Sequence, residues 1–335
     1  MKKALILSIY ILLILGIVGS VLINKIQSLA SDLKVSLSDL MSPLAEDIAD
    51  KNEMYFLILG IGGEDHEGPT LTDSITVARL DLTQNTLHTL GLPRDIWHND
   101  IKDKINSIYA YSLNEDHKNE SFGYTKRHFS SLLGLSLDSM VVLDFATFES
   151  IIDEIGGITI TLNKGFVDPW FPKKGFENKE CEPYDADYKC RYVTLSFPKG
   201  TYDINGKTAL NFVRSRHAEG DSGGDFSRSS RQQIVISAIR SKIEKIIKDR
   251  DLEKLANIIK ILDRRIVRDR KNAEYIPLAR QILLSKDKFT INSHTFTSDY
   301  FEVPNYDDYE GKYVLVPTDG DYDKFKKDIA RLLKE

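Results

Sequence analysis

The chain has 335 residues, 41% hydrophobic and 10% aromatic, which is enough to bury the core of one large domain or two modest ones. Its formal net charge of −5 argues against sequence-independent nucleic-acid binding, because that function needs a basic surface to replace the counterions of the phosphates. Any site for an anionic ligand must therefore be local.

Residues 1–25 predict a membrane anchor. Lys2 and Lys3 precede twenty residues without a charge, 4–23. At about 1.5 Å per residue, a helix of this length spans a hydrocarbon core of about 30 Å. A cleaved signal peptide is the alternative, but its apolar core is shorter, roughly 7 to 15 residues. We expect a single-pass protein of the cell membrane, with a cytoplasmic N-terminus and the rest of the chain outside.

The next segments predict a stalk and then a sheet. Residues 26–52 are polar, and Pro43 interrupts them, which is typical of a linker. An apolar run at 55–59 reads as a buried strand that enters a glycine-rich loop. Two alternating segments, 73–82 and 86–92, predict a hairpin.

Helices and strands then alternate along the chain. Expected helices lie at 105–113, 124–133 and 147–155, and expected strands at 140–145 and 158–162. Strands separated by helices of about ten residues predict a layered α/β domain. The hairpin makes a mixed sheet the expected arrangement.

Residues 163–192 read as an ordered surface insertion that carries both cysteines. Outside the cytoplasm, Cys181 and Cys190 can form a disulfide, and two unpaired thiols are the alternative. Two cysteines without clustered histidines do not predict a zinc site.

After the stalk, the chain divides into a core, 53–240, and a C-terminal segment, 241–335, which packs on or beside the core. Helical periodicity covers 234–284. A short strand at 313–316, a turn and a lysine-rich helix at 322–333 end the chain.

Four segments combine charged residues with turns. They are GIGGEDHEGPTLTDSI at 60–75, LPRDIW at 92–97, KINSIYAY at 104–111 and ALNFVRSRHAEGDSGGDFSRSSRQQ at 209–233. No lysine of the Walker type follows the glycines of the first segment, so it does not predict a nucleotide-binding loop. Asp73 closes the glycine-rich loop, where a carboxylate can hold Mg²⁺ that bridges phosphate oxygens; a simple turn or cap residue is the alternative.

The last segment concentrates arginines in an acidic chain. Arg214 and Arg216 are two residues apart and project from one face of an extended segment. A helix with Asp225 as N-cap would place further phosphate-binding side chains on one stripe near its positive end: Arg228, Arg231 and Gln232. The planar guanidinium forms two parallel hydrogen bonds to phosphate oxygens, so this pattern predicts a phosphate site. A surface salt-bridge network with Asp95, Glu219 and Asp225 is the alternative.

These segments together resemble the LytR-CpsA-Psr family. The glycine loop, TDSI at 72–75, PRD at 93–95, KIN and YAY within 104–111, GGI at 156–158 and the run from VRSR to DFSRSSRQ look like its successive signatures. The resemblance covers residues 55–240 and implies a three-layer α/β/α domain. The apolar interior of that fold accepts a polyprenyl tail, and its arginine cluster holds the head group.

The resemblance also assigns roles to individual residues. It implies a Mg²⁺ (or Mn²⁺) ligand at Asp73 and pyrophosphate binding by five side chains: Arg94, Arg214, Arg216, Arg228 and Gln232. Arg231 joins this set through the helix stripe, and Asp73 or Asp95 is the general base. Asp73, Arg94, Asp95 and Arg228 are thus the expected catalytic residues.

The sequence departs from the family at the end of the first strand. Many members carry an aspartate where this chain has Ile61, Gly62 and Gly63. A second metal ligand would have to come from Glu64, Asp65, water or the phosphate itself.

The implied activity is transfer of a glycopolymer from a polyprenyl-pyrophosphate carrier to peptidoglycan, at the C6 hydroxyl of N-acetylmuramic acid, with polyprenyl phosphate leaving. The expected partners are the lipid-linked glycan, peptidoglycan and the lipid bilayer, and no nucleic acid is expected. A hydrolase of lipid-linked substrates and a non-catalytic lipid-binding wall protein are the alternatives. A DNA-binding regulator is a further alternative, but no helix-turn-helix pattern or basic face supports it.

Overall fold

The computed structural model describes residues 51–64, 68–173, 175–176, 179–182, 187–215, 217–218, 224–249, 251–271, 274–275, 278 and 290–335. The expected transmembrane helix at 1–25, and the stalk up to residue 50, lie outside these residues. Within the described part of the chain, no helix combines the length and apolarity needed to cross a bilayer. The domain described below is the compact unit formed by Asn52–Asp269 and Asp287–Glu335.

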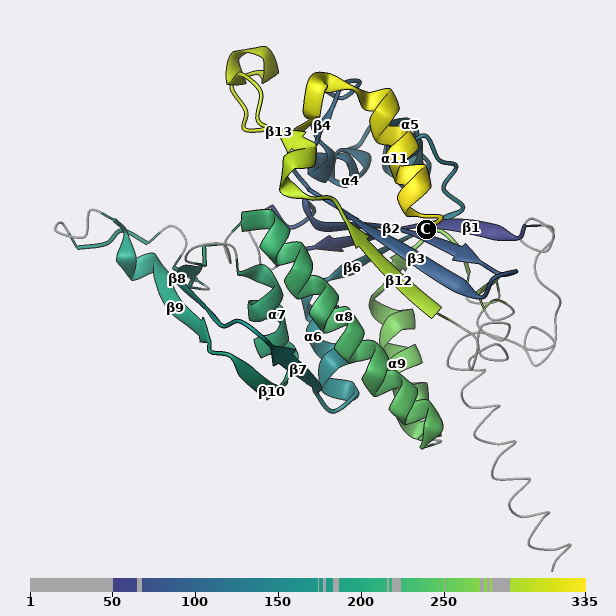
Figure 1. The fold of residues 1–335 in the computed structure, drawn as a ribbon, viewed down its shortest axis with the longest axis vertical. Helices are drawn as coiled ribbons and strands as arrows, with labels where there is room; N and C mark the ends of the chain where they lie inside the picture. The colour runs from purple at the N-terminus through teal and green to yellow at the C-terminus, as the bar shows by residue number, and fades with distance from the viewer. Residues whose placement is uncertain are drawn as a thin grey trace, which may run out of the picture. The chain divides into compact units, whose positions relative to one another are not determined.

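A mixed sheet forms the centre of the domain (Figure 1). Its strands, in spatial order, are β11 (Val267–Arg268), β6 (Ser139–Asp144), β1 (Glu53–Ile61), β2 (Thr72–Asp81), β3 (Thr86–Leu92) and β12 (Thr290–Thr295). β1 pairs with β6 in parallel and with β2 in antiparallel orientation. β3 likewise pairs with β12 in parallel and with β2 in antiparallel orientation. The predicted α/β fold with a mixed sheet is confirmed.

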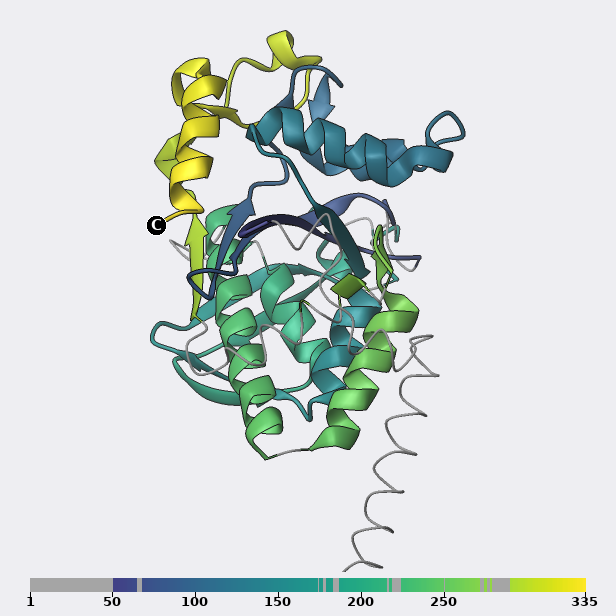
Figure 2. The same ribbon diagram turned by 90° about the vertical axis from the view of Figure 1, so that its right-hand side faces the viewer.

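Helices cover both faces of this sheet (Figures 1 and 2). On one face lie α4 (Ile108–Ser112), α5 (Ser121–Leu133) and α11 (Tyr322–Leu332). On the other face lie α6 (Phe145–Glu154), α7 (Gly206–Arg214), α8 (Gly224–Lys248) and α9 (Leu252–Arg265). The predicted end of the core at residue 240 lies inside α8, and the segment after residue 240 supplies β11 and β12 to the central sheet.

Short strand pairs lie outside the central sheet. They are β4 (Trp97–His98) with β5 (Asp103–Lys104), β7 (Ile158–Leu162) with β10 (Gly200–Ile204), β8 (Phe166–Pro172) with β9 (Tyr192–Phe197), and β13 (Phe301–Glu302) with β14 (Val316–Pro317). The β8–β9 pair carries the insertion expected at 163–192. A disulfide joins Cys181 to Cys190 within it.

Two large hydrophobic cores stabilise the described part of the domain. The first fills the space between the sheet and α5 and α11, and its fully buried members include Leu57, Phe129 and Phe325. The second joins α6, α7 and the β7–β10 pair around residues such as Phe212. Burial of one such phenylalanine contributes about 1.5–3 kcal/mol, so these cores fix the strand ends that carry the polar residues.

The segment at 206–214 differs from its expected form. The two-residue spacing of the arginines predicts an extended segment at Arg214, whereas Arg214 is the last residue of α7. The Asn205 side chain caps this helix by accepting from Thr208 N at 2.9 Å. Helical spacing then buries Leu210 and Phe212 in the second core. This burial favours the helix over the extended segment that the spacing of the arginines predicts.

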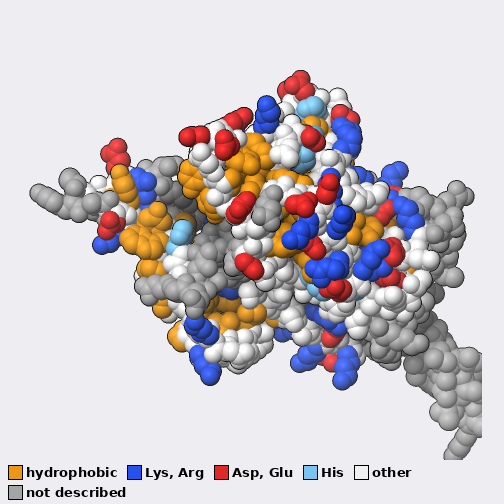
Figure 3. Space-filling model, turned by 45° about the horizontal axis from the view of Figure 1, so that its top comes forward, with side chains coloured by type: hydrophobic (Ala, Val, Ile, Leu, Met, Phe, Trp, Pro, Cys, Tyr) orange, Lys and Arg blue, Asp and Glu red, His pale blue; other side chains and the backbone are white. Residues whose placement is uncertain are grey.

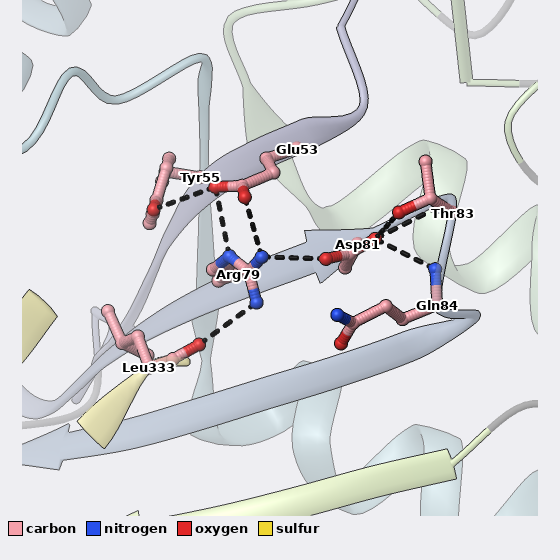
Figure 4. Close-up of polar contacts among 7 residues, drawn as sticks. All are labelled: Glu53, Tyr55, Arg79, Asp81, Thr83, Gln84 and Leu333. Atoms are coloured by element: carbon pink, nitrogen blue, oxygen red, sulfur yellow. Dashed lines mark hydrogen bonds and ion pairs between the residues drawn. The ribbon is translucent and has the colours of Figure 1, made fainter. Parts of the chain in front are cut away.

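A buried ion cluster ties the C-terminal helix to the sheet (Figure 4). Arg79 on β2 is 4% exposed, and its Nη2 lies 2.7 Å from Glu53 and 2.6 Å from Asp81. Its Nη1 donates to the Leu333 carbonyl at the end of α11, at 3.3 Å. The hydrogen bond from Arg79 is the main reason why the pKa of Glu53 is lowered. Both carboxylates therefore stay charged beside the guanidinium at neutral pH.

Candidate active site

Asp73 lies at a β-bulge where β2 begins. Gly60 and Ile61 are consecutive on β1, but they face Ser74 and Thr72, so Asp73 is the extra residue on β2. A bulge turns a side chain out of the regular alternation of its strand. The carboxylate is 36% exposed, so the bulge presents it to solvent at the end of a central strand pair.

Arg94 lies between two carboxylates. It follows β3, forms an ion pair with Asp73 through Nη1, and its Nε lies 3.6 Å from Asp95. Asp95 is buried and accepts from Lys104 Nζ at 2.8 Å. The backbone N–H of Asn106 donates to the Arg94 carbonyl at 3.2 Å. The PRD and KIN segments thus form one polar unit with the carboxylate of the TDSI segment.

An open cleft of about 960 Å³ is lined by residues that are close in sequence to the bulge. Its lining includes Ile61 and Thr70, which flank the bulge on β1 and before β2. Its apolar lining comes from Phe145, Phe171, Val193 and Leu210, and its charged lining from Glu64, Asp144, Glu149, Lys173, Lys207 and Arg214. The cleft therefore offers both an apolar wall and cationic groups.

Arg214 places its guanidinium over aromatic rings of the cleft. The Cζ atom lies 5.0 Å from the ring centroid of Phe145 and 5.9 Å from that of Phe171. Both rings also line the cleft. Cation–π contacts of this kind attract a guanidinium to the faces of aromatic rings.

Gly63 lets the end of β1 pass close to α6. The Asp144 side chain caps α6 by accepting from Thr147 N at 2.7 Å, and Asp144 and Gly63 both line the cleft. Gly63 has φ +83°, and a Cβ there would lie 3.2 Å from Asp144 Cβ. A larger residue at this position would strain the loop.

Arg231 faces the protein interior. It is 5% exposed, donates to the Ser215 carbonyl, and lies 4.8 Å over the Phe166 ring. Burial lowers the pKa of Arg231 to about 10, although the charge of Asp168 acts in the opposite direction. Because this value is well above 7, the guanidinium remains charged and fixes the residue that follows Arg214.

The structure describes the other expected site residues only in part. Arg216 lies outside the described residues. Arg228 belongs to α8, but its side chain lies outside the described part, as does that of Asp225. Gln232 is half-buried on α8. α8 begins one residue before the Asp225 expected as its N-cap.

Asp168 and Ser215 are absent from the set expected from the sequence. The fully buried Asp168 accepts from Ser215 Oγ at 2.7 Å, from Trp170 N at 3.1 Å and from His217 N at 3.2 Å. Asp168 follows Val167 and precedes Pro169 in the insertion, and no local spacing links it to residue 215. A buried carboxylate with three donors is a positioning group for the Arg214 segment.

Charge on the molecular surface is mixed. Figure 3 shows basic and acidic side chains interspersed over one face of the molecule. The arginines of the cleft and of the PRD segment are therefore local features in an acidic chain.

The fold is of the mixed α/β class. Comparison of the sequence with models of protein families identifies the family. The LytR_cpsA_psr family model matches residues 20–331, and the chain belongs to that family. The prediction made from the motifs is confirmed.

Two characterised relatives are similar in sequence. The chain is 26% identical over 258 residues to the polyisoprenyl-teichoic acid–peptidoglycan teichoic acid transferase TagV of Bacillus subtilis, covering 73% of this chain and 58% of TagV. It is 28% identical over 217 residues to the regulatory protein MsrR of Staphylococcus aureus, covering 63% of this chain and 56% of MsrR. The matches thus span less than two thirds of these relatives.

A solved structure shares the fold. The LytR-CPS2A-psr family protein YwtF (TagT), with bound octaprenyl pyrophosphate lipid, aligns with a TM-score of 0.52 at 21% identity. The alignment covers 85% of this chain and 92% of that chain.

Proposed function

We propose that this protein transfers a glycopolymer from a polyprenyl-pyrophosphate carrier to a sugar hydroxyl of peptidoglycan, and releases polyprenyl phosphate. One observation carries the proposal: a β-bulge presents Asp73 in an ion pair with Arg94, next to a cleft that contains Arg214. The names of TagV, a teichoic acid transferase, and of TagT with octaprenyl pyrophosphate support the substrate class.

The arginines would bind the pyrophosphate. In the structure Arg94 is neutralised by Asp73, and an incoming phosphate oxygen would replace or share that carboxylate. The Arg214 guanidinium lies over the Phe145 ring and can donate to a second phosphate group. Charge neutralisation by such groups is the main requirement for transfer of a phosphoryl group. Arg216, Arg228 and Gln232 remain proposed members of the same set.

The reaction would proceed by attack at phosphorus. The oxygen of the wall sugar hydroxyl forms a bond to the phosphorus attached to the glycopolymer, and the bond from that phosphorus to the bridging oxygen breaks. The bridging oxygen leaves with polyprenyl phosphate. Asp95 is buried against Lys104 and Arg94, whereas Asp73 is partly exposed, so we assign the hydroxyl proton to Asp73.

The residues present fit Mg²⁺ (or Mn²⁺) only together with the substrate. Asp73 offers one carboxylate, which already binds Arg94. Glu64 lines the cleft, and Asp65 lies outside the described residues. Mg²⁺ is commonly held by one or two carboxylates plus phosphate oxygens and water, so Asp73 would hold it once phosphate is bound. The metal would neutralise charge on the phosphate oxygens.

The apolar part of the site suits a lipid tail. On β1, Phe56 and Ile58 alternate with the fully buried Leu57 and Leu59 but are only half-buried, although helices lie on both faces of the sheet. Phe145 and Leu210 give the cleft its own apolar lining. Incomplete cover of a central strand is consistent with an interior that accepts a polyprenyl chain.

We also propose that the protein is anchored by residues 1–25 and works outside the cytoplasm. The uncharged run at 4–23 has the length of a membrane span. The disulfide between Cys181 and Cys190 is of a kind that persists outside reducing compartments.

The test is a reaction of the full chain in detergent with a polyprenyl-pyrophosphate-linked saccharide, peptidoglycan fragments and Mg²⁺. Mass spectrometry would follow polyprenyl phosphate and wall-linked sugar in the wild type and in Asp73→Asn. We expect both products from the wild type and a loss of about 100-fold or more in the variant, the range for removal of a general base.

Other outcomes would identify the alternatives. Polyprenyl phosphate with free glycan and no wall adduct would identify a hydrolase. A wild type that binds the lipid but forms no product would identify a binding protein, an alternative favoured by the glycines at 62 and 63 in place of the family aspartate.

A further inference from the structure

Two histidines and an aspartate meet at a place that the proposed transfer reaction does not use. His98 is on β4, Asp100 is in the turn after it, and His128 is on α5. One potential ligand atom from each lies within 4.8 Å of the other two. We propose that these three side chains bind a divalent transition-metal ion of the Zn²⁺ type.

The hydrogen bonds of His98 orient it for this role. Its Nε2 lies 3.0 Å from the backbone oxygen of His128. A carbonyl oxygen only accepts, so Nε2 carries the proton and Nδ1 carries the lone pair. Histidine ligands usually donate their second N–H to a carbonyl or carboxylate in this way, which fixes the ring. In the absence of a metal, Nδ1 accepts from Asp100 N at 3.2 Å, a long bond that a metal would replace.

The other two ligands are available. Within the described part of the chain, no hydrogen bond or ion pair occupies the ring nitrogens of His128 or the carboxylate of Asp100. The His128 ring is held in place by Tyr124, at 4.4 Å between centroids, and by His98, at 5.2 Å. A ring held in this way keeps its nitrogens beside the other two side chains.

The donor set selects the class of ion. Two imidazole nitrogens and one carboxylate oxygen suit Zn²⁺, with water at a fourth position. Mg²⁺ and Ca²⁺ prefer sites made of oxygen ligands, so the proposed phosphate-bound Mg²⁺ would not compete strongly here. The two metals would occupy separate places in the chain.

A metal here would fasten the β4–β5 hairpin to α5. In that hairpin His98 pairs with Asp103, and Trp97 pairs with Lys104. Lys104 in turn holds the Asp95 carboxylate at 2.8 Å. The ion would thus stabilise the element that positions the PRD segment, without touching the substrate.

The test measures zinc bound to the full chain after treatment with a chelator, by equilibrium dialysis against Zn²⁺ and elemental analysis. The ligand variants are Asp100→Asn, which changes an exposed side chain, and His128→Phe, which keeps the ring contact with Tyr124. His117→Phe is the matched control, because His117 also stacks on Tyr124, at 4.3 Å, but is not one of the three ligands.

We expect the wild type and the control to bind zinc equally, and excess Mg²⁺ to leave this binding in place. Both ligand variants should lose affinity by more than the roughly 10- to 100-fold that follows removal of an outer hydrogen-bond partner. A wild type that binds no zinc, or ligand variants that bind it as tightly as the control, would overturn the site. If circular dichroism shows that His128→Phe does not fold, the zinc affinity of Asp100→Asn alone decides whether the site exists.

Discussion

At the scale of single residues, the arginines of the site divide into two kinds. Arg94 and Arg214 are partly exposed or line the cleft, next to a carboxylate and aromatic rings respectively. Arg231 is buried and donates to the carbonyl of Ser215, the residue after Arg214. We infer that Arg94 and Arg214 contact the substrate and that Arg231 positions the residue that follows Arg214.

This division predicts different effects on stability. Arg231→Ala should lower the free energy of unfolding by about 3–5 kcal/mol, because it leaves the buried Asp168 charge without its nearby cation. Arg214→Ala should cost about 1 kcal/mol or less, since it removes a group at the surface of the cleft. Urea denaturation followed by circular dichroism measures both.

A contrary result would change the role of Arg231. If Arg231→Ala unfolds at the wild-type urea concentration but no longer binds polyprenyl pyrophosphate, Arg231 is a direct ligand, as the spacing of Arg228, Arg231 and Gln232 predicts.

At the scale of elements, the ends of the strands and the helix caps determine where the polar groups lie. The bulge at Asp73, the cap of α6 at Asp144 and the end of α7 at Arg214 each give a side chain its direction. The C-terminal helix α11 lies over the first core and is fixed to β2 by Arg79 (Figure 4).

The Arg79 cluster predicts a link between the sheet and α11. Arg79→Ala should lower the free energy of unfolding by about 3–5 kcal/mol, because Asp81 is left buried without its cation. Hydrogen exchange should also accelerate in α11, where the Leu333 carbonyl loses its donor. Arg331→Ala is the control, since Arg331 pairs with Glu335 and Asp328 on the surface of the same helix. Equal exchange rates in the two variants would show that Arg79 does not hold this helix.

Local patterns predicted many of these elements and missed others. The strands β1, β2, β3, β6 and β7, and the helices α5, α6 and α11, follow from alternation, helical periodicity and glycine positions. α7 was missed because the two-residue spacing of Arg214 and Arg216 fits an extended chain, whereas the Asn205 cap and the apolar spacing favour a helix. β12 was missed because Thr290–Thr295 is polar and pairs with β3 from about two hundred residues away.

At the scale of the whole molecule, the sequence motifs could be predicted, whereas contacts between distant segments could not. The sequence motifs predicted that Asp73, Arg94 and Arg214 belong to one family site. The sequence could not show that Asp168 supports Ser215, or that His98 lies beside His128, because these contacts depend on how distant segments pack. Family membership explains the shared motifs, whereas the contacts around these motifs are visible only in the folded structure.

The proposed function requires that the cleft beside Asp73 and Arg94 binds the pyrophosphate of a polyprenyl carrier. The most direct measurement is the Kd of the full chain for polyprenyl pyrophosphate in detergent, compared between the wild type, Arg214→Ala and Arg240→Ala. Arg240 is the control, because it pairs with Glu244 on the surface of α8 and does not line the cleft. Hydrogen bonds to charged groups contribute about 1.5–3 kcal/mol, so Arg214→Ala should weaken binding by about 10- to 100-fold and Arg240→Ala should leave it unchanged. Equal Kd values for all three proteins would contradict the claim.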